Sequence, residues 1–168
     1  MFGENSNTIP PLGPCTEVRH ERACIKVQKV YDGRRTRICE IRQFDATPPV
    51  PVGVGPYIVA SCEIVPNSDR VISTSIVPIP GTMPPLAEVT ATVACDAEFR
   101  VIDASGIEYT FTREVAFTVT VILYTPDPFM LVQAEIQCFC LDACLEPFET
   151  DTDVVVSCYF GAFIQIKV

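Results

Sequence analysis

Regular alternation of apolar and polar residues over two neighbouring segments is the feature that most constrains this sequence. From 87 to 101 every odd-numbered residue is apolar, and the residues between them are mostly charged or threonine. The same alternation runs from 107 to 123, after the turn-forming segment Asp103-Ala104-Ser105-Gly106. Side chains of a strand point alternately to its two faces, so this pattern is typical of half-buried antiparallel strands. We therefore predict a long β-hairpin.

Shorter segments of the same character fill most of the remaining chain. Val, Ile, Thr, Phe and Tyr predominate in them, and prolines are scattered throughout, which favours strands over long helices. We predict strands over 23–31 and 35–44 around an Asp32-Gly33 turn, and over 57–65, 71–79, 129–141 and 154–168, the last with a bulge or break at Gly161. In 57–65 we expect one face to consist of Ile58, Ala60, Cys62 and Ile64.

The predicted fold class is all-β, with one antiparallel β-sandwich or jelly-roll-like domain. A distorted barrel would satisfy the same pattern. The domain is expected to span residues 23–168. Residues 1–22 have three prolines and no sustained periodicity, and are interpreted as an extended N-terminal arm.

Composition and charge argue against several classes of function. The net charge of −9 would repel a phosphate backbone, so we expect no nucleic-acid partner. No apolar segment approaches the ~20 residues of a membrane-spanning helix, so no membrane span is expected. The segment Met1 to Asn5 lacks the basic start and apolar stretch of a secretory signal.

No catalytic constellation is evident. The single histidine, His20, lies in the predicted arm, where no rigid scaffold would orient it for catalysis. The glycines of segment 52–56 precede no helix, so this segment is interpreted as a loop rather than a phosphate-binding site. Four acidic residues could suit calcium but match no EF-hand spacing, and we interpret them as a solvated loop: Glu146, Glu149, Asp151 and Asp153. We expect neither enzymatic activity nor a cofactor.

The nine cysteines require an explanation of their own. We interpret most of them as disulfide candidates: Cys15, Cys24, Cys39, Cys138, Cys140, Cys144 and Cys158. Cys62 and Cys95 lie on apolar strand faces and are expected to act as small hydrophobic side chains. Zinc or copper binding by Cys138, Cys140 and Cys144 is an alternative, although the CxxC spacing of structural zinc sites is missing. An odd number leaves one cysteine for another role, and Cys15 is the candidate for an intermolecular cross-link.

The segment Cys24 to Asp32, CIKVQKVYD, followed by Arg37-Ile38-Cys39, resembles the opening of cysteine-rich spore-surface proteins of clostridia and their relatives. These proteins are akin to SPOCS-type spore coat and exosporium proteins. The proline-rich arm with Cys15 is similar to the N-terminal connector of endospore-appendage subunits. The resemblance implies synthesis without a signal peptide, exposure when the mother cell lyses, and cross-linking of successive protomers.

Together these features predict a structural subunit of a disulfide-reinforced extracellular fibre or spore-surface layer. Its expected partners are copies of itself, with other spore-surface proteins as further candidates. Its expected location is the spore or cell surface. The alternative is a carbohydrate- or metal-binding β-sandwich module, and a hydrolase or redox enzyme is the weakest hypothesis.

Overall fold

A computed structural model describes residues 21–22, 32–127 and 130–168 of the chain, and the described part contains strands but no helix. The strands are β1 (Glu21–Arg22), β2 (Gly33–Asp45), β3 (Ile58–Ile64), β4 (Arg70–Ile79), β5 (Leu86–Ile102), β6 (Glu108–Tyr124), β7 (Gln133–Cys144), β8 (Phe148–Glu149) and β9 (Val154–Lys167). The all-β prediction is confirmed.

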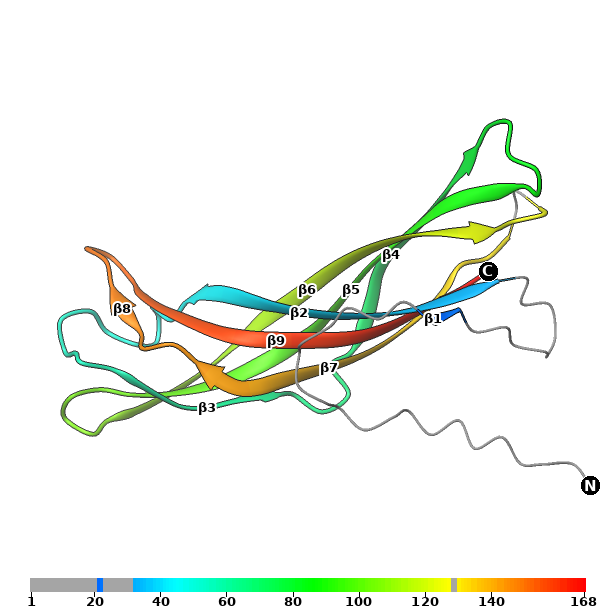
Figure 1. Cartoon of the computed structure of the whole chain (residues 1–168). Coiled ribbons are helices and arrows are strands. Elements are labelled where there is room, and N and C mark those ends of the chain that lie inside the picture. The colour runs from blue at the N-terminus through cyan, green and yellow to red at the C-terminus, as the bar shows by residue number, and fades with distance from the viewer. Residues whose placement is uncertain (1–20, 23–31, 128–129) are drawn as a thin grey trace, which may run out of the picture.

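The strands form two antiparallel sheets that lie face to face (Figure 1). In the first, which we call the β5 sheet, β5 pairs with β6 along one side and with β4 and then β3 along the other. In the second, the β9 sheet, β9 lies between β2 and β7, while β1 pairs with β2 and β8 pairs with β9. The result is an antiparallel β-sandwich.

The long predicted hairpin is confirmed as β5 and β6. Their register is continuous from the pair Leu86 and Tyr124 to the pair Ile102 and Glu108. Every odd-numbered residue from 87 to 101 is fully buried. On the opposite face threonines face one another across the strands, with hydroxyl–hydroxyl hydrogen bonds of 2.9 and 3.1 Å for Thr90–Thr120 and Thr92–Thr118 respectively. The exception is Ile107, which was assigned to the buried face but lies in the turn and is exposed.

Two β-bulges alter the predicted faces of the shorter strands. In β3 the register shifts between Val59 and Ser61, so Ala60 is the inserted residue. One extra residue reverses the alternation, because side chains alternate with a period of two. The predicted common face of 57–65 is therefore wrong: Ile58 and Ala60 are exposed, whereas Cys62 is buried. A similar shift lies between Val71 and Ser73 in β4.

The predicted bulge or break at Gly161 is also wrong. The strand β9 pairs without interruption through Gly161 with both neighbours, opposite Cys39 of β2 and Phe139 of β7. A Cβ atom at position 161 would overlap the ring of Phe139. The glycine is thus explained by the aromatic ring that lies against its backbone.

The predicted turn at Asp32-Gly33 differs from the structure. Gly33 is the first residue of β2 and pairs with Lys167 of β9. The residues opposite Arg34 and Arg35 are Arg22 and Glu21, which had been assigned to the arm. The predicted strand 23–31 and residues 1–20 of the predicted arm lie outside the described residues.

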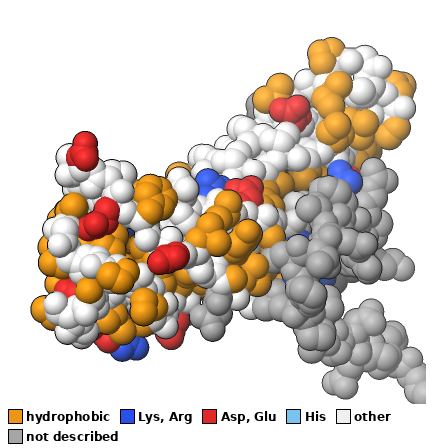
Figure 2. All heavy atoms as spheres, turned by 60° about the vertical axis from the view of Figure 1, so that its left-hand side comes forward, with side chains coloured by type: hydrophobic (Ala, Val, Ile, Leu, Met, Phe, Trp, Pro, Cys, Tyr) orange, Lys and Arg blue, Asp and Glu red, His pale blue; other side chains and the backbone are white. Residues whose placement is uncertain are grey.

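The β5 sheet extends beyond the β9 sheet at the end where β4 and β5 connect (Figure 1). In the space-filling view this end forms the upper lobe, on which hydrophobic side chains gather (Figure 2). The connection between β4 and β5 contains Pro80, Pro84 and Pro85, which cannot donate ladder hydrogen bonds. In the described part of the chain, one end of the sandwich is therefore a single projecting layer.

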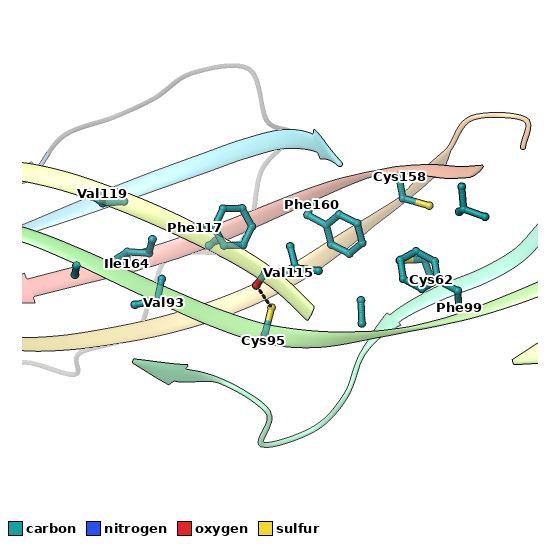
Figure 3. Close-up of a cluster of buried hydrophobic side chains, with 14 of the residues drawn as sticks. Cys62, Val93, Cys95, Phe99, Val115, Phe117, Val119, Cys158, Phe160 and Ile164 are labelled. Atoms are coloured by element: carbon teal, nitrogen blue, oxygen red, sulfur yellow. Dashed lines mark hydrogen bonds between the residues drawn. The ribbon is translucent and has the colours of Figure 1, made fainter. Parts of the chain in front are cut away.

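Aromatic rings fill the middle of the sandwich between the two sheets (Figure 3). The ring of Phe99 on β5 lies 5.2 Å from that of Phe44, 5.1 Å from that of Phe111 and 6.1 Å from that of Phe160. Such offset and edge-on contacts add to the stabilisation from area burial alone. This cluster joins residues of β2, β5, β6 and β9, so it couples the two sheets.

Two adjacent residues of β6 test this arrangement. Phe117 is buried, whereas Thr118 points to the exposed face. We expect Phe117→Ala to lower the free energy of unfolding by ~3–5 kcal/mol through cavity formation. Thr118→Ala should cost less than ~1 kcal/mol, because it removes one exposed cross-strand contact. Urea unfolding of the two variants measures the difference, and equal costs would contradict the register described for β6.

Candidate functional site

Disulfides join cysteines that are far apart in the sequence. Cys95 of β5 bonds to Cys138 of β7, with a Cα–Cα distance of 6.5 Å, and so links the two sheets. Cys144 of β7 bonds to Cys158 of β9 across neighbouring strands, with a Cα–Cα distance of 4.0 Å. The expectation that Cys95 acts only as a small hydrophobic side chain is therefore wrong.

Of the other disulfide candidates, Cys39 is disulfide-bonded. The Sγ atom of Cys140 donates a hydrogen bond to the backbone carbonyl of Tyr159 at 3.7 Å. Cys15, Cys24 and the histidine His20 lie outside the described residues. No intermolecular role is therefore assigned to Cys15 by the geometry, and it stays a prediction.

The two disulfides restrict the unfolded chain to different extents. Their cysteines are separated by 43 residues for Cys95–Cys138 and by 14 for Cys144–Cys158. The loss of loop-closure entropy corresponds to about 4 and about 3 kcal/mol respectively in the chain-entropy model. The bond between the sheets is thus the more stabilising of the two in this model.

A cluster of three sulfur atoms lies at the Cys144–Cys158 disulfide. The Sγ atoms of Cys62, Cys144 and Cys158 all lie within 4.8 Å of one another. Cys62 comes from β3 of the β5 sheet, and the other two come from the β9 sheet. Sequence reasoning grouped Cys138, Cys140 and Cys144 instead, but Cys138 turns to Cys95 and Cys144 turns to Cys158.

A second group combines the Cys95–Cys138 disulfide with the carboxylate of Asp69, again within 4.8 Å. Burial raises the pKa of Asp69 above its ordinary value, against the opposing effect of a hydrogen bond from the backbone of Cys138. This hydrogen bond gives the carboxylate a structural role beside the bond that links the sheets.

The acidic loop contributes a structural contact rather than a gathered cation site in the described part of the chain. Glu149 accepts hydrogen bonds from the Tyr57 hydroxyl at 2.6 Å and from the Gly53 backbone at 2.5 Å. The hydrogen bond from Tyr57, followed by that from Gly53, lowers the pKa of Glu149. Burial and the hydrogen bond to Glu149 raise the pKa of Tyr57. The glycine-containing segment is a loop, as predicted, and Glu149 holds it in place.

Asp103 holds the turn between β5 and β6. Its carboxylate accepts hydrogen bonds from the backbones of Ser105 and Ile107 at 2.8 and 2.9 Å. It also accepts one from the Tyr109 hydroxyl at 3.1 Å. Burial acts to raise the pKa of Asp103, but the hydrogen bonds outweigh it and the pKa is lowered.

Exposed apolar side chains lie on the projecting end of the β5 sheet. We call this surface the distal patch, and it consists of the exposed residues Val77, Met83 and Ile122 and the half-buried residues Ile79 and Leu86. The register places Val77 and Ile122 on either side of Glu88, and Ile79 beside Leu86. Apolar residues gathered in this way, here with Glu88 between two of them, are typical of protein–protein contact surfaces, which combine apolar and polar groups.

No family model, curated protein or solved structure matches this chain. In the described residues no helix has the length and hydrophobicity needed to cross a bilayer. The features of the molecule that bear on function are therefore the disulfides, the sulfur cluster and the distal patch.

The carboxylate of Asp103 makes the stability of the hairpin depend on pH. Folding lowers its pKa below the ordinary value of 3.8, so its contribution is present above that pH and is lost as the pH falls through the folded-state pKa. We expect Asp103→Asn to be less stable than the wild type at neutral pH, and the difference to shrink as the pH falls below 3.8 and through the folded-state pKa. Urea unfolding across this range measures it. A difference that does not change with pH would contradict the role of the charge.

Proposed function

We propose that this chain is a structural subunit that assembles with copies of itself into a disulfide-reinforced extracellular fibre or spore-surface layer. The observation that carries the proposal is the distal patch on a projecting end of the sandwich. The free energy decreases when a second molecule covers an apolar surface of this kind. The resemblance of segment 24–39 to spore-surface proteins supports the location.

The strand β4 supplies a second reason for assembly. It pairs with β5 on one side, and among the described residues no strand pairs with its other side. Residues 71–79, VISTSIVPI, contain no charge, and most of their side chains are exposed. Edge strands of monomeric proteins usually have charges that prevent pairing with another chain. The uncharged segment between the bulge after Val71 and Pro78 therefore favours addition of a strand from a neighbour.

Copies of the chain are the proposed partner, and the negative charge of the chain determines where two copies can make contact. The net charge of −9 makes most approaches of two copies repulsive. Residues 71–87 contain no charged side chain, so contact through β4 and its connection to β5 brings together few of these charges, with Glu88 as the acidic residue within the distal patch. Charge repulsion elsewhere then restricts association to that end of the molecule.

Disulfides reinforce the assembly in this proposal. The bonds Cys95–Cys138 and Cys144–Cys158 stabilise each subunit. A disulfide through Cys15 to a neighbour would keep the two subunits close together when their contact surfaces separate, so that the contact forms again before either subunit dissociates. Thiols that a living cell keeps reduced can oxidise once the cell lyses.

The alternative function, a carbohydrate- or metal-binding module without assembly, is distinguished by negative-stain electron microscopy of the purified protein. Ordered fibres or sheets support the proposed function. Monodisperse particles under oxidising conditions would contradict it.

The distal patch is tested with two matched lysine substitutions. Val77 and Ile107 are 57 % and 54 % exposed, and they lie at opposite ends of the β5 sheet. We expect Val77→Lys to abolish assembly, because a charged side chain on an edge strand opposes pairing with a neighbouring chain and would replace an apolar contact of the distal patch. Ile107→Lys should assemble like the wild type. Sedimentation and electron microscopy give the readout, and loss of assembly in both variants would argue against a specific role of the distal patch.

The cross-link is tested with Cys15→Ser. We expect the variant to form assemblies of normal appearance that dissociate to monomers in hot detergent without reductant. The wild type should stay at high mass until reductant is added. Equal dissociation of the wild type with and without reductant, with no peptide linked through Cys15 by mass spectrometry, would show that the cross-link is absent.

A further inference from the structure

The three-sulfur cluster consists of one disulfide and the sulfur atom of a third cysteine. The bond Cys144–Cys158 uses two sulfur atoms, and the Sγ atom of Cys62 lies within 4.8 Å of both. The three cysteines come from three different strands, β3, β7 and β9. The three sulfur atoms meet only through the tertiary fold, because successive residues of one strand point to opposite faces of the sheet. We propose that, when Cys144 and Cys158 are reduced, the three thiolates form a binding site for a soft cation, Cu(I) or Zn(II).

The spacing of the sulfur atoms fits one shared ion. Thiolates bound at about 2.3 Å to a single ion lie about 4 Å from one another. The present separations of up to 4.8 Å therefore need only a small adjustment of side-chain rotamers. Breaking the bond between Cys144 and Cys158 moves these two sulfur atoms apart, toward that spacing.

The backbone of β7 directs Cys144 into the cluster. Between Cys140 and Cys144 the strand has four steps, whereas its partner β9 has two between Phe160 and Cys158, so two residues are extra. Bulges of this kind re-aim a side chain. Without the extra residues Cys144 would lie two positions further along β9 and away from Cys158. The bulge thus places the third ligand.

The surroundings select a soft cation. Cys62 and Cys158 belong to the hydrophobic core, and Cys144 is half-buried against it. Figure 3 shows Cys62 and Cys158 reaching the same end of the core from opposite sheets. Among the described side chains the cluster has sulfur ligands only, a donor set that calcium and magnesium do not favour and that Cu(I) and Zn(II) do. Half-exposed Cys144 gives the ion a route from solvent.

Metal binding and the disulfide exclude one another at this site. In the bonded form Cys144 and Cys158 have no thiolate to offer, so at most one of the three ligands remains. The cluster therefore holds the ion under reducing conditions and the covalent bond under oxidising ones. This inference is independent of assembly, because all three cysteines belong to one chain.

The test measures affinity of the full-length, fully reduced protein for Cu(I) and, separately, for Zn(II), in anaerobic competition with a chromophoric chelator. We expect the wild type to bind one equivalent of at least one ion, and Cys62→Ser to weaken it by more than ~100-fold, because loss of a direct ligand exceeds the effect of an outer-shell partner. Cys140→Ser is the matched control on β7 and should bind like the wild type. Circular dichroism verifies that each variant is folded, and Cys62→Ala provides a second substitution.

A second measurement locates the ion. Saturation with the ion should protect Cys62, Cys144 and Cys158 from alkylation by iodoacetamide, as read by peptide mass spectrometry, and should leave Cys140 reactive. Equal affinity of wild type and Cys62→Ser, or protection of other cysteines instead, would overturn the proposal. Absence of tight binding of both ions would overturn it as well.

Discussion

The pairing of β5 along its whole length is the interaction on which the rest of the structure depends. Three strands, β3, β4 and β6, pair with it, and its odd-numbered side chains from 87 to 101 are fully buried. Together with buried residues of β6, these side chains form the surface against which the β9 sheet packs. Cys95, at the middle of the same face, makes the covalent link to that sheet. One strand therefore sets the register of its own sheet and positions the other.

The sequence predicted those parts of the fold in which a local pattern and the final environment agree. The hairpin of β5 and β6 follows directly from alternation, because both strands have one buried face. The bulge at Ala60 was not predicted, since an inserted residue is visible only through the partner that it fails to face. Gly161 illustrates the same limit. A glycine within a strand indicates a local constraint, but the constraint here is the ring of Phe139 on a neighbouring strand.

The candidate sites were predicted less well than the fold, because they depend on contacts between distant segments. Proximity in the sequence suggested a group of Cys138, Cys140 and Cys144, yet strands direct such neighbours to different partners. The residue that completes the sulfur cluster, Cys62, is 82 positions before Cys144 and could be placed only from the sheet packing. Glu149 likewise looked like one of several solvated acids until Tyr57 and Gly53 were found beside it.

The central position of β9 has a consequence for the order in which the sandwich can form. The β5 sheet is built from one continuous segment, residues 58–124, so all of its partners are available once that segment has been synthesised. By contrast, β2 pairs with β9 along its whole length, so Gly33 near the start of the described chain pairs with Lys167 near its end. During synthesis β2 therefore lacks its partner β9 until the end of the chain has been made, while the inner face of the β5 sheet is not yet covered by β9. A ribosome-bound fragment that stops before β9 would expose both surfaces, and exposed apolar surface and unpaired strand edges favour aggregation.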